Sequence, residues 1–134
     1  MRLYTWRQTA LANLPYAVMV ALGAVVLLYS LGDTALAVLT AVAFLAYGVA
    51  GALWIMVFVC PYCGYHGTHG CPCGYGVLSA RLAKKGSHNC FAEKFKRHIP
   101  VIVPLWLIPA MVGGIALGIH FSWERRILLS AFAI

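Results

Sequence analysis

Four of the five cysteines in this 134-residue chain fall between positions 60 and 73, close enough in sequence to serve one metal ion. They form two pairs, Cys60-x2-Cys63 and Cys71-x-Cys73, which are separated by seven residues. Two thiolates from each of two short turns can complete a tetrahedral site around zinc or iron. The spacing therefore indicates a metal-binding loop.

Proline and glycine accompany both cysteine pairs as metal-binding turns require. Proline fixes the entry to a turn, and a glycine directly after the second cysteine, such as Gly64 or Gly74, can adopt the positive φ that turns backbone amides toward the sulfurs. Residues 60–76 resemble the paired knuckles of rubredoxin-like and zinc-ribbon modules, including the small ribbon of rubrerythrins. The resemblance is confined to this stretch. It implies that one iron or zinc ion has four ligands, Cys60, Cys63, Cys71 and Cys73. The second pair has one intervening residue where those modules have two, which leaves the geometry of its turn open.

The metal is predicted to be zinc rather than iron, because zinc is the commonest occupant of such structural sites. Iron or a small iron–sulfur cluster stays open, since all-thiolate sites suit both, although the spacing matches neither ferredoxin pattern. A redox-active dithiol without metal is a further alternative. Whether His66, His69 or Cys90 contributes to the site is left open. Haem is not expected, because His98 and His120 would lie about 33 Å apart along one helix.

The elements that must position this loop are apolar. Hydrophobic residues make up 63% and charged residues 10% of the chain, far from the roughly 45–50% and 25% of soluble domains. Lipid must therefore cover part of the surface, and the chain is predicted to be an all-α integral membrane protein with a single membrane domain over 1–134. Transmembrane helices are expected over 10–31, 34–59 and 99–123. The first could pass for a secretion signal, but it is long enough to span and a second apolar run follows at once.

Turn residues and prolines should shape these spans. Gly32 can end the first helix in a left-handed conformation and Asp33 can cap the second, which predicts a tight antiparallel hairpin. Three prolines, at positions 100, 104 and 109, remove backbone hydrogen bonds in the third span. The third helix is therefore expected to be kinked.

Residues 77–98 form a basic segment between the second and third spans. It holds six of the ten basic residues, and such a cluster beside apolar spans favours the cytoplasmic side and contact with anionic lipid headgroups. Two short amphipathic helices, broken at 86–87, are expected to lie in the headgroup region. This predicts a multi-pass protein of the cell inner (cytoplasmic) membrane, with the cysteine loop in the cytoplasm, where thiols stay reduced. Nucleic-acid binding is not expected, since no recognised motif accompanies the net charge of +7.

The expected function is that of a small non-catalytic subunit of a larger membrane complex, respiratory or otherwise energy-converting. A metal ion would cross-link the cytoplasmic loop, which is too small to fold by burial alone, and the loop would dock partner subunits. The alternative is an electron-transfer subunit whose four-cysteine site holds iron and relays electrons to a membrane partner. Enzymatic activity is not expected, because Asp33, Glu93 and Glu124, which are all the carboxylates of the chain, have simpler explanations as a cap, a helix-surface pair and an interfacial charge.

Overall fold

The computed structural model describes residues 3–32, 34–119, 126–127 and 130–132, and these form helices, turns and irregular segments with no strand among them. The chain divides into two compact units. We call Met1–Pro15 with Ala50–Val101 the loop unit, and Tyr16–Val49 with Ile102–Ile134 the bundle unit. Three helical stretches are long and apolar enough to cross a membrane, Trp6–Leu31, Ala35–Tyr62 and His88–Gly118. This confirms the prediction of an all-helical chain with three such helices.

Helix α1 (Trp6–Leu31) begins earlier than residue 10, where the sequence was expected to become helical. The reason is a cap: the side-chain oxygen of Gln8 accepts hydrogen bonds from the Thr5 amide (3.0 Å) and the Thr5 hydroxyl (3.2 Å). A threonine followed three residues later by glutamine is the signature of a capping box. The polar start of α1 is therefore helical before the apolar run begins.

The turn between α1 and α2 (Ala35–Phe58) follows the predicted chemistry in part. Gly32 adopts the left-handed conformation (φ 75°), as expected for a residue that ends a helix. The hydroxyl of Thr34 accepts a hydrogen bond from the Ala37 amide (3.3 Å) and so caps α2. Asp33, for which this role was predicted, lies outside the described residues.

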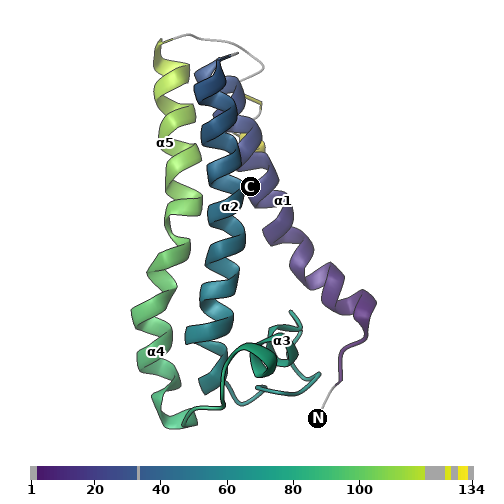
Figure 1. The fold of residues 1–134 in the computed structure, drawn as a ribbon. Coiled ribbons are helices and arrows are strands. Elements are labelled where there is room, and N and C mark those ends of the chain that lie inside the picture. Colours follow the sequence, from purple (N-terminus) through teal and green to yellow (C-terminus); the bar gives the residue numbers. More distant parts are fainter. Residues whose placement is uncertain (1–2, 33, 120–125, 128–129, 133–134) are drawn as a thin grey trace. The chain divides into compact units, whose positions relative to one another are not determined.

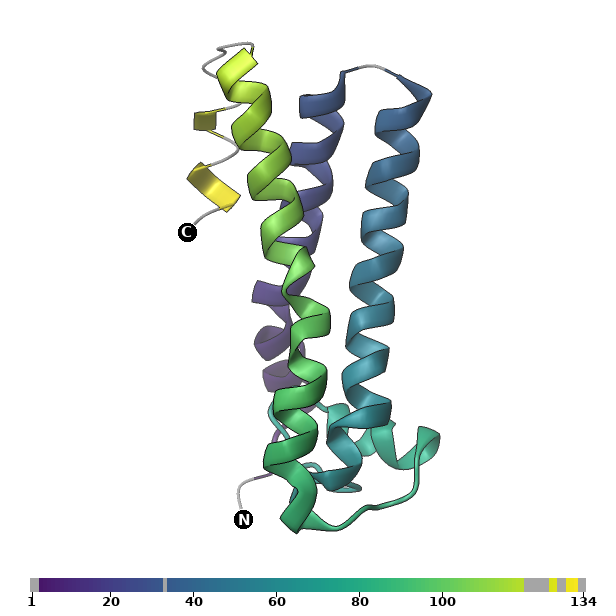
Figure 2. The ribbon, with the colours of Figure 1, turned by 90° about the vertical axis from the view of Figure 1, so that its left-hand side faces the viewer.

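The core of the bundle unit is formed by α1, α2 and α5 (Pro104–Ile119), whose segments lie side by side in Figure 2. Glycine permits the close approach: a Cβ on Gly48 would meet Val20 Cγ1 at 2.8 Å, and the Tyr16 hydroxyl donates to the Gly48 carbonyl at 2.7 Å. The buried side chains of this core are Val20, Ala24, Leu27, Ala41, Phe44 and Leu105.

Four short elements between α2 and α5 lie in the loop unit. They are the 3₁₀ turn η1 (Cys60–Tyr62), helix α3 (Tyr75–Leu82), the 3₁₀ turn η2 (His88–Cys90) and helix α4 (Phe91–His98). The two short helices on either side of residues 86–87 are thus present. Figure 1 shows α3 beside the segment that follows α2.

The predicted third span of 99–123 contains two helix types. A 3₁₀ segment, η3 (Ile99–Ile102), precedes α5, which begins at Pro104 and contains Pro109. Proline suits the first position of a helix, where its missing N–H has no intrahelical partner. This explains why the α-helix starts at Pro104 and not at residue 99. Residues 120–123 lie outside the described part of the chain.

Candidate functional site

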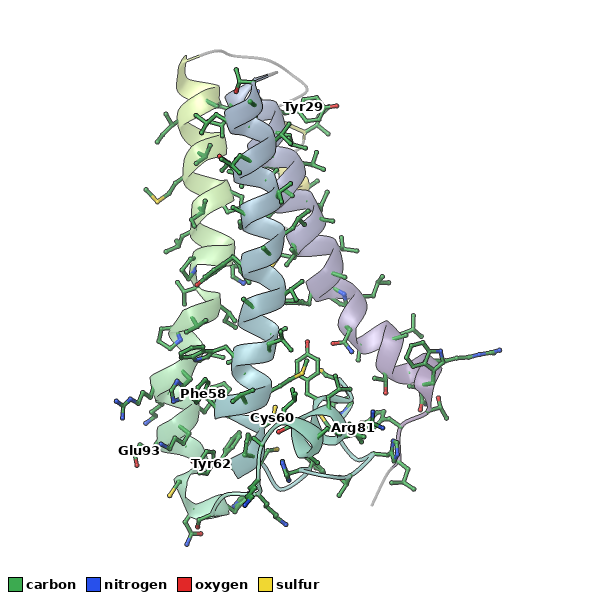
Figure 3. All side chains as sticks on the ribbon, in the orientation of Figure 1. Tyr29, Phe58, Cys60, Tyr62, Arg81 and Glu93 are labelled. Carbon is green, nitrogen blue, oxygen red and sulfur yellow. The ribbon has the colours of Figure 1, made fainter. Side chains whose placement is uncertain are left out.

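The first cysteine pair sits on a tight turn that directly follows α2. Cys60 begins η1, Pro61 occupies its first turn and is buried, and the Cys63 amide donates to the Cys60 carbonyl at 3.1 Å. This bond brings the two ends of the Cys60–Cys63 segment together, as a two-thiolate knuckle requires. Figure 3 places Cys60 between the end of α2 and α3.

The second pair is closed by a bond from the Gly74 amide to the Cys71 carbonyl (3.1 Å), with Gly74 in the left-handed conformation at φ 72°. The prediction for Gly74 is confirmed, but the matching prediction for Gly64 is wrong. In the first half of the loop the left-handed residue is Gly67, at φ 76°. The chain leaves the 3₁₀ turn extended at Cys63 (ψ 144°), so it reverses only at the next turn, where the His66 amide donates to the Cys63 carbonyl at 3.1 Å.

The four thiols occupy one neighbourhood. Cys60, Cys63, Cys71 and Cys73 are all half-buried and none is in a disulfide. The Cys60 thiol lies near enough to interact electrostatically with the other three. Burial, and then the neighbouring Cys71, raise the pKa of the Cys73 thiol. Within the described part of the chain, however, no three cysteine, histidine or acidic side chains are arranged closely enough to hold a metal ion. The sulfurs gather on one loop without converging on one point, and the ligand set stays a prediction.

Helix α3 covers the loop between the two pairs. A Cβ on Gly76 would collide with the backbone carbonyl oxygen of Tyr65 and would lie 3.2 Å from that of Thr68. The Gly76 carbonyl in turn accepts from the Gly67 amide at 2.9 Å. Only glycine permits this approach of a helix to a backbone. Residues 65–68, which connect the pairs, are therefore held against α3.

One buried polar group of α3 has no hydrogen-bond partner. Ser79 is fully buried, and its hydroxyl makes no hydrogen bond. Most buried hydroxyl groups in proteins form hydrogen bonds, so a buried hydroxyl without a partner is unusual. The burial of this residue could not be predicted, because a serine in a short helix carries no sequence signal of burial.

The beginning of the chain also contacts the cysteine loop. The Tyr4 amide donates to the His69 carbonyl at 3.0 Å, and the Asn13 side chain donates to the Cys73 carbonyl at 2.9 Å as well as to the Thr9 carbonyl at 2.8 Å. This contact was not predicted from the sequence. A signal was present: Thr9 and Asn13 are polar residues four apart at the start of an apolar helix, and so share one face.

The three residues left open as extra ligands lie in different surroundings. The His66 Nε2 is 3.2 Å from the Ala83 carbonyl, at the end of α3, and this contact occupies that nitrogen. Cys90 is half-buried at the start of α4, and His69 contributes its carbonyl to the contact with Tyr4. A further neighbour of the first cysteine turn is His88, whose Nε2 would be 3.5 Å from a Cβ on Gly64. His88 is thus the histidine beside the first cysteine turn.

A cluster of rings joins α2 to α4 at the end of the apolar stretch. The Trp54 indole N–H donates to His98 Nδ1 at 3.2 Å, and the Phe58 ring stacks on the His98 ring with centroids 5.3 Å apart. Figure 3 shows Phe58 directed toward α4 and Glu93 pointing outward from it. Tryptophan and basic residues are typical of the membrane–water interface. The cluster thus has the residue types that occur at such an interface.

Comparisons of the chain with models of known protein families, with curated proteins and with solved structures find no match.

Proposed function

We propose that this chain is a small non-catalytic subunit of a larger membrane complex, in which one metal ion cross-links the cysteine loop through Cys60, Cys63, Cys71 and Cys73. The observation that carries the proposal is the gathering of four free, half-buried thiols on one loop, within electrostatic reach of Cys60. Such thiols repel one another once they are deprotonated, and a bound cation reverses that repulsion.

The donor set fits zinc better than a harder ion, because four sulfurs suit a soft or borderline metal. A change of χ1 rotamer moves a cysteine sulfur by about 3 Å, so the thiols can turn inward while the turns that carry them stay in place. When bound, zinc supplies a structural cross-link between the two turns.

The proposed location is the cell inner membrane, with the cysteine loop in the cytoplasm. Support comes from the three apolar helices and from the basic last turn of α4, formed by Lys96, Arg97 and His98. His98 contacts the rings of Trp54 and Phe58, and Lys96 and Arg97 directly precede it in the chain, at the depth where anionic lipid headgroups would meet them. A maleimide that cannot cross the membrane should label the metal-free thiols from the cytoplasmic side alone.

The proposed partners are helices of other membrane subunits. A Cβ placed on Gly114 or Gly118 of α5 would have no neighbour within 4 Å in the described structure. Small residues four apart let a second helix approach closely in lipid. The cytoplasmic loop would add a second, polar contact with the same complex.

Electron transfer is the second candidate. The observation that favours it is the position of Cys60, two residues after the end of α2. Iron held there would lie at the membrane surface, within short reach of a partner in the membrane. Both candidates fit a respiratory or related energy-converting complex.

Metal analysis of the purified protein tests both candidates. About one zinc per chain and no colour supports the structural site, whereas visible thiolate-to-iron absorption that bleaches on reduction supports the electron relay. Cys60→Ser and Cys73→Ser should each lower the metal content, with Cys90→Ser as the matched control that keeps it. The proposal fails if the wild-type protein holds no metal, or if both variants keep the full amount.

A further inference from the structure

The first cysteine pair lies on a turn with the dimensions of a disulfide. The Cys63 amide donates to the Cys60 carbonyl at 3.1 Å, so the turn closes between the two cysteines themselves. The Cα atoms at the two ends of such a turn are less than about 7 Å apart, and a disulfide joins Cα atoms about 4.4–6.8 Å apart. Side chains three residues apart in a 3₁₀ turn point the same way. The φ of Cys63 (−77°) stays in the helical range, so its side chain keeps that direction.

The turn of the second pair has a different geometry. The bond that closes it runs from the Gly74 amide to the Cys71 carbonyl, so Cys73 lies inside the turn and not at its end. A disulfide needs two sulfurs, whereas a structural metal site needs four that converge on one point. Of the two turns, the first is the one that joins cysteine to cysteine.

The two residues between Cys60 and Cys63 are held in place from outside the turn. The Pro61 carbonyl accepts from the Gly86 amide at 2.9 Å, and a Cβ on Gly86 would collide with the Tyr62 ring. Lys94 Nζ lies 5.4 Å from the centroid of the same ring, within the range of a cation–π contact. None of these contacts involves a sulfur. The turn can therefore keep its backbone conformation whether its cysteines are thiols or a disulfide.

We propose that Cys60 and Cys63 form a reversible dithiol–disulfide couple, whose oxidant is the disulfide of a thiol-bearing partner. The thiolate of one cysteine attacks a sulfur of that disulfide, which breaks the partner's S–S bond and releases the first partner thiol. The other cysteine then attacks the mixed disulfide, which forms the Cys60–Cys63 bond and releases the second partner thiol. Two electrons pass to the partner, and the two cysteine protons end on the two released thiols. The reverse direction uses a dithiol as reductant.

This activity suits the proposed position of the loop in the cytoplasm. Disulfides that do form in the cytosol are usually transient, and catalytic or redox-sensing. The couple goes beyond the proposed subunit function, because it requires no metal ion. Metal and disulfide would use the same sulfurs, so the loop holds one or the other.

Glutathione buffers of graded oxidised-to-reduced ratio test the inference on the full chain, in detergent and after chelator treatment. Acid quenching, maleimide labelling and peptide mass spectrometry show which cysteines have reacted. We expect two of the five thiols to be lost together, with Cys60 and Cys63 in one disulfide and the other three labelled. A dithiol reductant should restore all five labels. Cys60→Ser and Cys63→Ser should each abolish the paired loss and leave the remaining cysteine as a mixed disulfide with glutathione.

Cys90→Ser is the matched control, because it removes a half-buried thiol outside both pairs and should keep the paired loss at the same buffer ratio. The inference is overturned if the disulfide joins Cys60 to Cys71, whose thiols also interact electrostatically. It is equally overturned if the thiols of the folded chain react singly with glutathione. Metal content is measured separately on untreated protein. A chain without metal loses the proposed structural site and keeps this inference, whereas a zinc-loaded chain that forms no Cys60–Cys63 bond after chelation loses this inference alone.

Discussion

Replacing Gly76 by alanine should destabilise the cysteine loop selectively. The new methyl group would collide with the Tyr65 carbonyl oxygen and would lie 3.2 Å from the Thr68 carbonyl oxygen. Both are backbone atoms, which cannot rotate away as the end of a side chain can. To accommodate the methyl, α3 must move off residues 65–68. That movement would also break the bond from the Gly67 amide to the Gly76 carbonyl, now 2.9 Å long.

The size of the effect follows from these contacts. Overpacking of a tight site costs about 1–3 kcal/mol, and the lost hydrogen bond costs about 1 kcal/mol. Alanine recovers about 0.5–1 kcal/mol relative to glycine within a helix. The net expectation is a destabilisation of about 1–3 kcal/mol. Metal content should fall with it, because the two cysteine pairs are joined by the segment that moves.

Gly114→Ala is the matched control, because it makes the same substitution in α5, where a Cβ would meet nothing within 4 Å. It should leave stability unchanged or raise it by about 0.5–1 kcal/mol. Thermal unfolding of both variants in the same detergent, followed by circular dichroism, measures the difference, and metal content per chain is measured on the same samples. If Gly76→Ala unfolds at the same temperature as Gly114→Ala and keeps its metal, the proposed packing of α3 on the loop is wrong.

Two further outcomes are expected. Asn13→Ala removes the donor to the Cys73 carbonyl, so it should lower the free energy of unfolding by about 0.5–1.5 kcal/mol. It should also loosen the start of α1, which hydrogen exchange of the first helical turns would detect. Asn89→Ala, at an exposed position, should do neither, and equal exchange in both variants would contradict the contact. The pH dependence should have opposite signs with and without metal. The pKa of the Cys73 thiol is raised in the folded metal-free chain above its usual value of 9.0. The unfolded chain therefore loses this proton at a lower pH than the folded chain. As a result, the contribution of Cys73 to the free energy of unfolding is complete below pH 9.0 and declines as the pH rises further. Metal retention should instead fall as pH falls, because protons compete for the thiolates. Chemical unfolding of chelator-treated Cys73→Ser checks the first sign: its alkaline decline should be weaker than that of the wild type, with the remainder due to Cys60, whose pKa burial raises to about 12. Metal content across an acid series checks the second.

The three long apolar helices could be predicted from the sequence because their signal is local. Runs of apolar residues between Trp6 and Gly118 define the three candidate spans regardless of what they contact. Gly32 and Gly74 were predicted correctly for the same reason, since each ends a helix or a cysteine turn where a positive φ is needed. The start of α1 was misplaced because hydropathy ignores the cap formed by Thr5 and Gln8.

The surroundings of the thiols depend on contacts that no local pattern contains. Tyr4 and Asn13 form hydrogen bonds to residues 69 and 73, some sixty positions away, and no sequence pattern in either segment predicts this pairing. Gly64 was assigned a turn that Gly67 makes, because the outcome depends on how the chain leaves the 3₁₀ turn after α2. The spacing of the cysteines therefore predicts which cysteines lie on one loop, whereas the groups that surround the thiols can be identified only from the structure.

The bonds that hold the loop are separate from the groups that would bind metal. Backbone pairs fix it at three places, from Tyr4 to His69, from Gly67 to Gly76 and from Gly86 to Pro61 (2.9 Å). Side-chain bonds from Asn13 and at His66 add to these without involving a sulfur. The thiols are thus free to change rotamer while the backbone stays in place. A loop arranged in this way would take up or release the proposed metal ion without first unfolding.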